Sequence, residues 1–157
     1  MNIFIHSFLP LPTSYYKEGR AEYEKRLSRY CKIKHTIYKN EKQLTKVRDK
    51  LKQLPFAAGK DAIIEVTAGE EKSLMDSSTL ASYIEEKGIQ GFSNLHFLIG
   101  FTAANQDMED TASLDLLASM DSLSISNMTI GTDLLSLILE EQIYRAYRIM
   151  KKEPYHK

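Results

Sequence analysis

Several short stretches of the chain alternate apolar and polar residues, and a period of two residues is typical of β-strands that are buried on one face. Residues 2–8 (NIFIHSF) and 32–38 (KIKHTIY) show this alternation. Residues 61–67 (DAIIEVT) and 94–100 (NLHFLIG) are more continuously apolar, as expected of strands in the centre of a sheet. A weaker strand is predicted for residues 121–128 (DSLSISNM).

Between these strands, apolar residues recur at three- and four-residue intervals, which predicts helices. The predicted helices cover residues 13–30, capped by Thr13; residues 41–54, ended by Pro55; residues 77–87, capped by Ser77 or Ser78 and closed by Gly88; a segment around Leu114 and Leu117; and residues 133–150.

Alternation of strands and helices predicts an α/β fold with a mostly parallel sheet and helices on both faces. No repeat or linker divides the chain, so residues 1–157 are expected to form one domain. Ligands of such folds bind beyond the carboxyl ends of the strands. The loops after Thr67, Gly100 and Met128 are therefore the places where a ligand site is expected.

The last predicted helix begins with apolar residues around nearly its whole circumference, namely Leu134, Leu135, Leu137, Ile138 and Leu139. Such a helix must be buried on more than one side. A chain of 157 residues has little material to cover it twice, so a homodimer contact is the simplest explanation. The second half of the helix carries a polar stripe made by Glu141, Arg145, Arg148 and Lys152.

The net charge of the chain is zero, but the charges are unevenly distributed. Residues 1–60 hold 14 Lys and Arg against 5 Asp and Glu, residues 61–140 hold 2 against 14, and residues 141–157 hold 5 against 2. Basic ends favour a polyanionic partner. Solvated helix faces would explain them equally well.

Composition narrows the class of protein. Cys31 is the single cysteine, and the four histidines lack metal-binding spacing, so neither a disulfide nor a metal site is expected. No stretch is long and apolar enough for a membrane span, and the N-terminus lacks the features of a signal peptide. These features predict a cytoplasmic protein.

Two short segments carry side chains suited to RNA chemistry. Tyr155 and His156, near the C-terminus, are residue types that stack on bases and move protons, although chain ends are usually idle. Tyr23 and Arg26 lie one helical turn apart. Spacing alone favours Tyr23 as a core residue and Arg26 as a solvated one.

Four segments together resemble the RlmH family, a group of SPOUT-class RNA methyltransferases. The C-terminal segment 140–149 (EEQIYRAYRI) followed by 154–157 (PYHK) carries most of the resemblance. Residues 19–26, 97–100 and 123–129 match further segments of the family in the same order. The similarity covers essentially the whole chain.

The resemblance implies a SPOUT-like fold with a C-terminal trefoil knot, a homodimer, and S-adenosylmethionine as cofactor. It further implies methylation of ring nitrogen 3 of a pseudouridine in 23S rRNA, on the assembled ribosome. The residues that match the family's cofactor site are Val66, Gly100, Phe101, Ser126, Asn127, Met128, Thr129, Ile130 and Gly131. The matching catalytic positions are His156, Tyr155, Arg145 and Glu141, and the matching RNA-binding positions are Tyr23, Arg26, Arg148 and Lys157.

The chain departs from the family pattern near the expected cofactor pocket. Phe101 replaces a glycine, Gly131-Thr132 replaces Pro-His, and the segment 102–121 is longer than in the family. Phe101 must either turn into the core or intrude on the pocket. An alternative function is therefore a SPOUT-fold RNA- or ribosome-binding protein with lost or altered cofactor use. A small ligand-binding α/β domain unrelated to RNA is a third possibility, which the basic ends and the Tyr-His tail disfavour.

Overall fold

The fold is known from a computed structural model, which describes residues 1–9, 14–52, 60–101 and 119–154. Thr13, Pro55, the expected helix around Leu114 and Leu117, and the tail residues 155–157 lie outside the described residues. The path of residues 102–118 would decide whether the chain is knotted, so the trefoil knot stays a prediction. No helix in the described ranges is both long enough and apolar enough to cross a bilayer.

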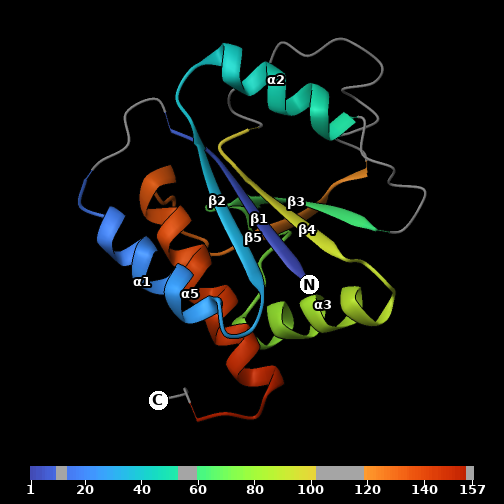
Figure 1. Ribbon diagram of the computed structural model, residues 1–157. Helices are drawn as coiled ribbons and strands as arrows, with labels where there is room; N and C mark the ends of the chain where they lie inside the picture. The colour runs from blue at the N-terminus through green and yellow to red at the C-terminus, as the bar shows by residue number, and fades with distance from the viewer. Residues whose placement is uncertain (10–13, 53–59, 102–118, 155–157) are drawn as a thin grey trace.

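Strands and helices alternate along the chain as the sequence predicts (Figure 1). The strands are β1 (Asn2–Phe8), β2 (Lys32–Tyr38), β3 (Asp61–Thr67), β4 (Asn94–Ile99) and β5 (Asp121–Ser124). The helices are α1 (Lys17–Leu27), α2 (Glu41–Lys52), α3 (Ser77–Ile89) and α5 (Thr132–Met150).

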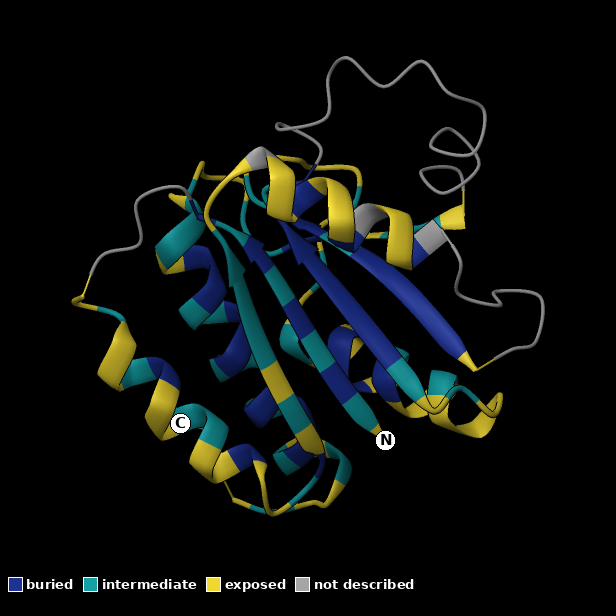
Figure 2. Cartoon of the chain, turned by 45° about the horizontal axis from the view of Figure 1, so that its top comes forward, coloured by how far each residue is buried: buried dark blue, intermediate teal, exposed yellow. Residues whose placement is uncertain are grey.

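All five strands form one parallel sheet in the order β2-β1-β4-β3-β5. The α/β fold with a parallel sheet is thus confirmed. Because parallel neighbours run in the same direction, the carboxyl ends of all five strands meet at one edge. The central strands β3 and β4 are buried along most of their length, whereas exposure increases toward β2 at the edge (Figure 2).

Helices cover both faces of the sheet, as predicted (Figure 1). The larger core lies between the sheet and helices α1, α3 and α5, and it contains Ile5, Phe97 and Leu139. A smaller core on the opposite face joins α2 to Ile63, Leu98 and Phe101. Helix α2 is therefore held by a narrow apolar stripe, while most of its surface faces solvent (Figure 2).

The weak strand predicted for residues 121–128 ends early, at Ser124. Past Ser124, the Ile125 amide still donates to the Thr67 carbonyl and the Gly69 amide donates to the Ser126 carbonyl. The chain then turns, and the Met128 amide donates to Ser126 Oγ at 2.9 Å. A side chain that bonds the backbone two residues ahead competes with strand pairing, which explains the early end.

The structure corrects the ends predicted for α3. The N-terminal cap is Asp76, whose Oδ1 accepts from the Thr79 amide at 2.7 Å, and not Ser77 or Ser78. The helix continues past Gly88 to Ile89. The Gly91 amide then bonds the Gly88 carbonyl and the Phe92 amide bonds the Lys87 carbonyl. This pair of bonds is a Schellman motif, and its left-handed position is Gly91, with φ +93°.

Replacing the cap should weaken α3 measurably. Asp76→Ala leaves the Thr79 amide without its partner, so the free energy of unfolding should fall by about 1 kcal/mol. Ser78→Ala is the matched control, because Ser78 is exposed and was an equally good cap from sequence. Urea denaturation of both variants checks the assignment, which a larger loss in Ser78→Ala would contradict.

Candidate active site

The loops that follow β3 and β5 are joined by their backbones. The Gly69 amide donates to the Ser126 carbonyl at 2.7 Å. Gly69 has φ +93°, and a Cβ atom there would lie 3.2 Å from Thr129 Oγ1. Glycine is therefore required at this position for two reasons, namely its backbone angle and the close approach of the second loop.

The end of β4 meets the start of α5 in a similar way. Gly100 has φ +78°, and a Cβ atom there would lie 3.2 Å from both the Phe8 carbonyl oxygen and Thr132 Cγ2. A hollow of about 510 Å³ lies beside this contact, lined by residues that follow β1 and begin α5. Gly131 has no atom within 4 Å of the place where its Cβ would stand. The loops predicted to hold a ligand therefore converge at the carboxyl edge of the sheet.

Two predicted cofactor residues have buried side chains. Val66 belongs to the larger core, so the accessible surface at the end of β3 is formed by the residues after it. Phe101 is 5 % exposed and packs under α2, with its ring edge-on to Tyr38 at 6.1 Å. Of the two arrangements open to Phe101 from sequence, the structure has the one in which the ring turns into the core.

Two of the predicted catalytic residues form an ordered pair on α5. Arg145 donates from Nε and Nη2 to Glu141 Oε1, at 3.1 and 2.8 Å. Gln142 Nε2 donates to Glu141 Oε2 at 2.6 Å, and Ser77 Oγ donates to Gln142 Oε1 at 2.7 Å. The ion pair is partly buried and is anchored to α3 through this chain of hydrogen bonds.

The structure brings three of the predicted RNA-binding residues together around Tyr144. The Arg26 guanidinium lies 5.7 Å from the Tyr23 ring and 5.9 Å from the Tyr144 ring, and the Arg148 guanidinium lies 5.9 Å from the Tyr144 ring. Tyr23 is partly buried against the core, as its spacing indicated. Sequence analysis missed the central role of Tyr144, because a tyrosine within a helical pattern does not reveal which cations surround it.

Arg148 also holds the end of the described chain. Its Nη2 donates to the Pro154 carbonyl at 2.8 Å, and its Nη1 lies 3.0 Å from Glu153 Oε2. Tyr30 donates its hydroxyl proton to the same Glu153 oxygen at 2.6 Å. This bond to a carboxylate raises the pKa of Tyr30, so the phenol keeps its proton and the contact persists at neutral pH. Tyr155, His156 and Lys157 follow directly but lie outside the described residues.

Ser7, His35 and Glu140 are linked by hydrogen bonds in the order of a hydrolase triad, but they are closed off from solvent. Ser7 Oγ lies 2.8 Å from His35 Nε2, and His35 Nδ1 lies 2.7 Å from Glu140 Oε1. Ser7 and Glu140 have no exposed surface, so a substrate cannot reach them. Glu24 completes a possible cation cluster with His35 and Glu140, but both His35 nitrogens already have these partners. The group ties α5 to the sheet.

Comparison with known proteins identifies the family of this chain. The family described as "Predicted SPOUT methyltransferase" matches residues 1–156. This chain belongs to the SPOUT methyltransferase family. The converging loops at the carboxyl edge include the residues that the family resemblance predicts for the cofactor site.

Curated relatives match the chain over its full length. "Ribosomal RNA large subunit methyltransferase H 1" of Clostridium perfringens (strain SM101 / Type A) is 34% identical over 166 residues, covering 100% of both chains. "Ribosomal RNA large subunit methyltransferase H" of Clostridium botulinum (strain Eklund 17B / Type B) is 36% identical over 165 residues, and that of Shouchella clausii (strain KSM-K16) is 36% identical over 168 residues, again with 100% of both chains covered. The resemblance to the RlmH family is confirmed.

The position of Phe101 has a measurable consequence. Phe101→Ala empties ring-sized space under α2 and should lower the free energy of unfolding by about 3–5 kcal/mol. Ile89→Ala should change it by less than about 0.5 kcal/mol, because Ile89 is 81% exposed. Chemical denaturation measures both. If Phe101→Ala kept its stability and only altered ligand binding, the ring would instead belong to the cofactor pocket.

Proposed function

We propose that this protein transfers a methyl group from S-adenosylmethionine to ring nitrogen 3 of a pseudouridine in 23S rRNA, in the cytoplasm and as a homodimer. Full-length similarity to rRNA methyltransferases supports the reaction class. The observation that carries the proposal for this chain is the convergence of the Gly69, Gly100 and Ser126–Gly131 loops. Phe101 turns away from them, so its size does not block the loop.

The residues present fit the cofactor. Gly69 and Gly100 let backbone segments approach closely, and Gly131 borders the hollow between the end of β1 and the start of α5. Residues 126–131 and the backbone at Gly100 would hold S-adenosylmethionine, which supplies an electrophilic methyl group. Positioning the target nitrogen in line with that methyl group is the main contribution of the protein.

The chain's own side chains handle the proton of the target base. His156 accepts the proton from ring nitrogen 3, which makes that nitrogen the stronger nucleophile. Arg145 stabilises the negative charge that develops on the base, and Glu141 fixes the orientation of Arg145 through two hydrogen bonds. Tyr23, Arg26 and Arg148, gathered around Tyr144, hold the RNA or the partner subunit, together with Lys157 of the tail, while Tyr155 lines the methyl-transfer site beside His156.

We infer that two chains build this site. The Pro154 carbonyl is bonded to Arg148, and His156 follows Pro154 by two residues, a reach of about 7 Å when extended. Arg148 and Gly131 are separated by 17 positions of chain, about 25 Å of helix. This separation supports an arrangement in which His156 of one chain lies at the cofactor loops of a second copy.

The apolar start of α5 offers the surface for that second copy. Leu135 and Leu139 are buried within the chain, whereas Leu134 is 37% exposed and Ile138 is partly exposed. These two residues lie one turn apart on the outward face of the helix. Covering them with the same face of a second chain would bury apolar surface that the monomer leaves in water.

A charge on this face should separate the subunits. Ile138→Asp places a carboxylate in the proposed interface without a partner, so the dimer should dissociate at micromolar concentration while the monomer stays folded. Ile89→Asp, on exposed α3 surface, should leave the dimer intact. Light scattering with circular dichroism distinguishes the two effects. A wild-type protein that is monomeric at this concentration would show the interface to be wrong.

Mixing two inactive variants tests both the activity and the shared site. Deletion of residues 155–157 removes the tail, and Gly131→Tyr fills the loop space of the other chain without clashing. Each homodimer should methylate ribosomes at less than a hundredth of the wild-type rate, whereas the mixture should regain about a quarter of it, because about half of the randomly paired dimers are mixed and each of these has one intact site. Mass spectrometry of 23S rRNA identifies the methylated nucleotide.

Calorimetry with S-adenosylmethionine is the control for this experiment. The tail deletion should retain cofactor binding and dimerisation, while Gly131→Tyr should weaken binding strongly. If wild-type protein binds no S-adenosylmethionine and transfers no methyl group, the chain is an RNA-binding protein that has lost the cofactor. If the mixture stays inactive although wild-type protein is active, each site is built from one chain.

A further inference from the structure

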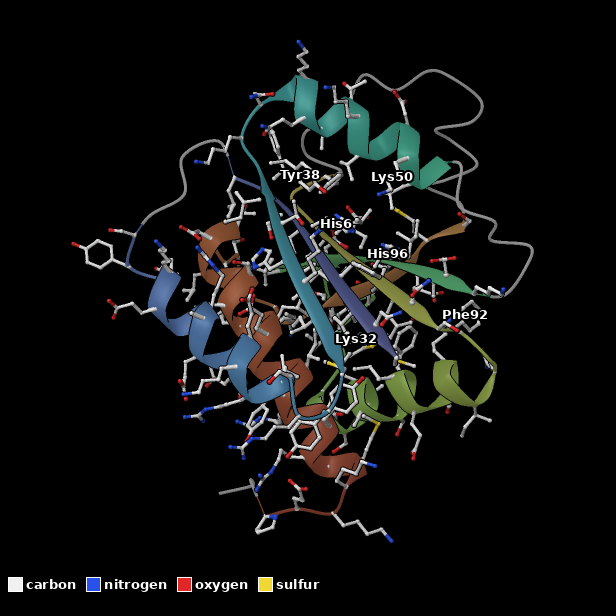
Figure 3. All side chains as sticks on the ribbon, viewed as in Figure 1. His6, Lys32, Tyr38, Lys50, Phe92 and His96 are labelled. Carbon is white, nitrogen blue, oxygen red and sulfur yellow. The ribbon has the colours of Figure 1, made fainter. Side chains whose placement is uncertain are left out.

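A second pocket lies under α2, on the opposite face of the sheet from the larger core. It has a volume of about 350 Å³, within the range of small-ligand sites. Its walls come from β2, β1, β4 and β3 on one side and from Val47, Lys50 and Leu51 of α2 on the other. His6, Tyr38, Lys50 and His96 are seen around it in Figure 3. None of the residues assigned to methyl transfer lines it.

Aromatic rings from neighbouring strands form a row of nearly parallel rings along this pocket. The ring centroids of Phe4 and His96 are 4.8 Å apart, those of His6 and His96 are 5.5 Å apart, and those of His6 and Tyr38 are 5.9 Å apart. The planes within each pair differ by no more than 22°. A row of parallel rings offers a flat, largely apolar wall to a planar ligand.

The same rings are linked by a chain of hydrogen bonds. Tyr38 Oη lies 3.0 Å from His6 Nδ1, His6 Nε2 lies 3.2 Å from His96 Nδ1, and His96 Nε2 lies 3.2 Å from Asp61 Oδ1. Because a carboxylate only accepts, His96 donates to Asp61, His6 donates to His96 and Tyr38 donates to His6. The Tyr38 oxygen can still accept, and the second oxygen of Asp61 takes no part in this chain.

The two histidines are uncharged at neutral pH. Burial, together with the nearby His96, His35, Lys50 and Lys34, lowers the pKa of His6 to about 3. Burial also lowers the pKa of His96, although its bond to Asp61 opposes the shift. The positive charge of the pocket therefore comes from its lysines and not from the imidazoles.

Those lysines are exposed, and the basic surface that they form extends beyond the pocket. Lys34 and Lys50 line the pocket, and neither forms an ion pair with an acidic residue in the described parts of the chain. Lys50 also lines a neighbouring hollow of about 330 Å³, together with Lys46. A flat-walled pocket is thus bordered by cations on both sides, with a second basic hollow directly beside it.

We propose that this pocket binds an unpaired nucleotide of the RNA, with its base beside the His6–His96 row and its flanking phosphates at Lys34 and Lys50. RNA is recognised through splayed bases that pack on aromatic side chains, with cations along the backbone. The Tyr38 oxygen and the second Asp61 oxygen supply acceptors for base amino groups. The shared position of Lys50 between two hollows favours a strand over a single nucleotide. This inference rests on the proposed action on ribosomal RNA.

Binding of a fluorescently labelled ten-nucleotide single-stranded RNA tests the site. Lys34→Gln and Lys50→Gln should each weaken binding several-fold, and each should reduce the slope of log affinity against log salt by about 0.7. Lys17→Gln is the matched control, because it removes the same charge from an exposed residue of α1 on the opposite face of the sheet. All three lysines are exposed, so the variants should fold. Equal effects in all three variants would overturn the proposal.

Nuclear magnetic resonance signals of the imidazole rings provide a second test, because non-specific charge attraction of RNA would not change them selectively. Saturating RNA should shift the ring signals of His6 and His96 in wild-type protein but not those of His35, which is sealed on the other face. Unshifted His6 and His96 signals would contradict the proposal. So would uridine monophosphate binding as tightly as the oligonucleotide, which would mark a site for free nucleotides.

The outcome is separable from that of the proposed function. Methyl transfer to ribosomes is measured in parallel, and Lys17→Gln, which lies outside both proposed sites, should keep the wild-type rate. If wild-type protein transferred no methyl group, the methyltransferase assignment would be refuted. The RNA-binding test would still be interpretable.

Discussion

The parallel pairing of β1, β4 and β3 is the constraint on which the rest of the structure depends. Both registers run the full length of β4, and Ile3, Ile5, Phe97 and Ile99 on one face are almost completely buried. Parallel strands need crossover connections, so helices must pass over the sheet and cover it. The same direction of all strands delivers Gly69, Gly100 and the loop after β5 to one edge, where backbone contacts join them. Burial of a central sheet thus brings together the loops to which we assign the cofactor.

Polar residues within this sheet show how exposure determines what a hydrogen-bonded histidine can do. Ser7 and His6 are neighbours on β1 and face opposite sides, as alternation requires. On the α5 side, His35 bridges Ser7 and the fully buried Glu140, and nothing reaches the group. On the α2 side, His6 and His96 lead to Asp61 along an accessible pocket. Similar chemistry is structural on one face and available to a ligand on the other.

Sequence periodicity predicted the bounds of β1 and β2 from their alternation, and the apolar run of residues 61–67 predicted those of β3. It failed at α3, where Asp76, Ser77 and Ser78 are three consecutive residues that can each serve as a cap. Only the backbone path shows that Asp76 is the one that bonds Thr79. Gly88 was the obvious end of the helix, but it faces the Met1 side chain and leaves the left-handed position to Gly91.

Some residues of the candidate site could likewise be predicted from sequence, and others could not. Gly100 and the Glu141–Arg145 pair could be located in advance, because a strand end and an i,i+4 spacing fix their neighbourhood. Tyr144 and the pocket under α2 could not. Both depend on which residues distant in sequence come together, as when Lys50 of α2 meets His6 of β1 and His96 of β4. From sequence alone, a basic helix such as α2 is interpreted as solvated, because the residues of the sheet that face it are not known.

In the proposed dimer, one stripe of helix α5 carries both the subunit contact and the residues assigned to catalysis. Leu134, Ile138, Glu141 and Arg145 follow one another at four-, three- and four-residue intervals, so they occupy one side of the helix. The apolar part of this stripe, which we assign to the subunit contact, leads directly to the ion pair assigned to catalysis. Burying an ion pair at an interface is costly unless its geometry is fixed beforehand. The bonds through Gln142 to Ser77 fix it within one chain, so a second chain can approach a charge pair that is already ordered.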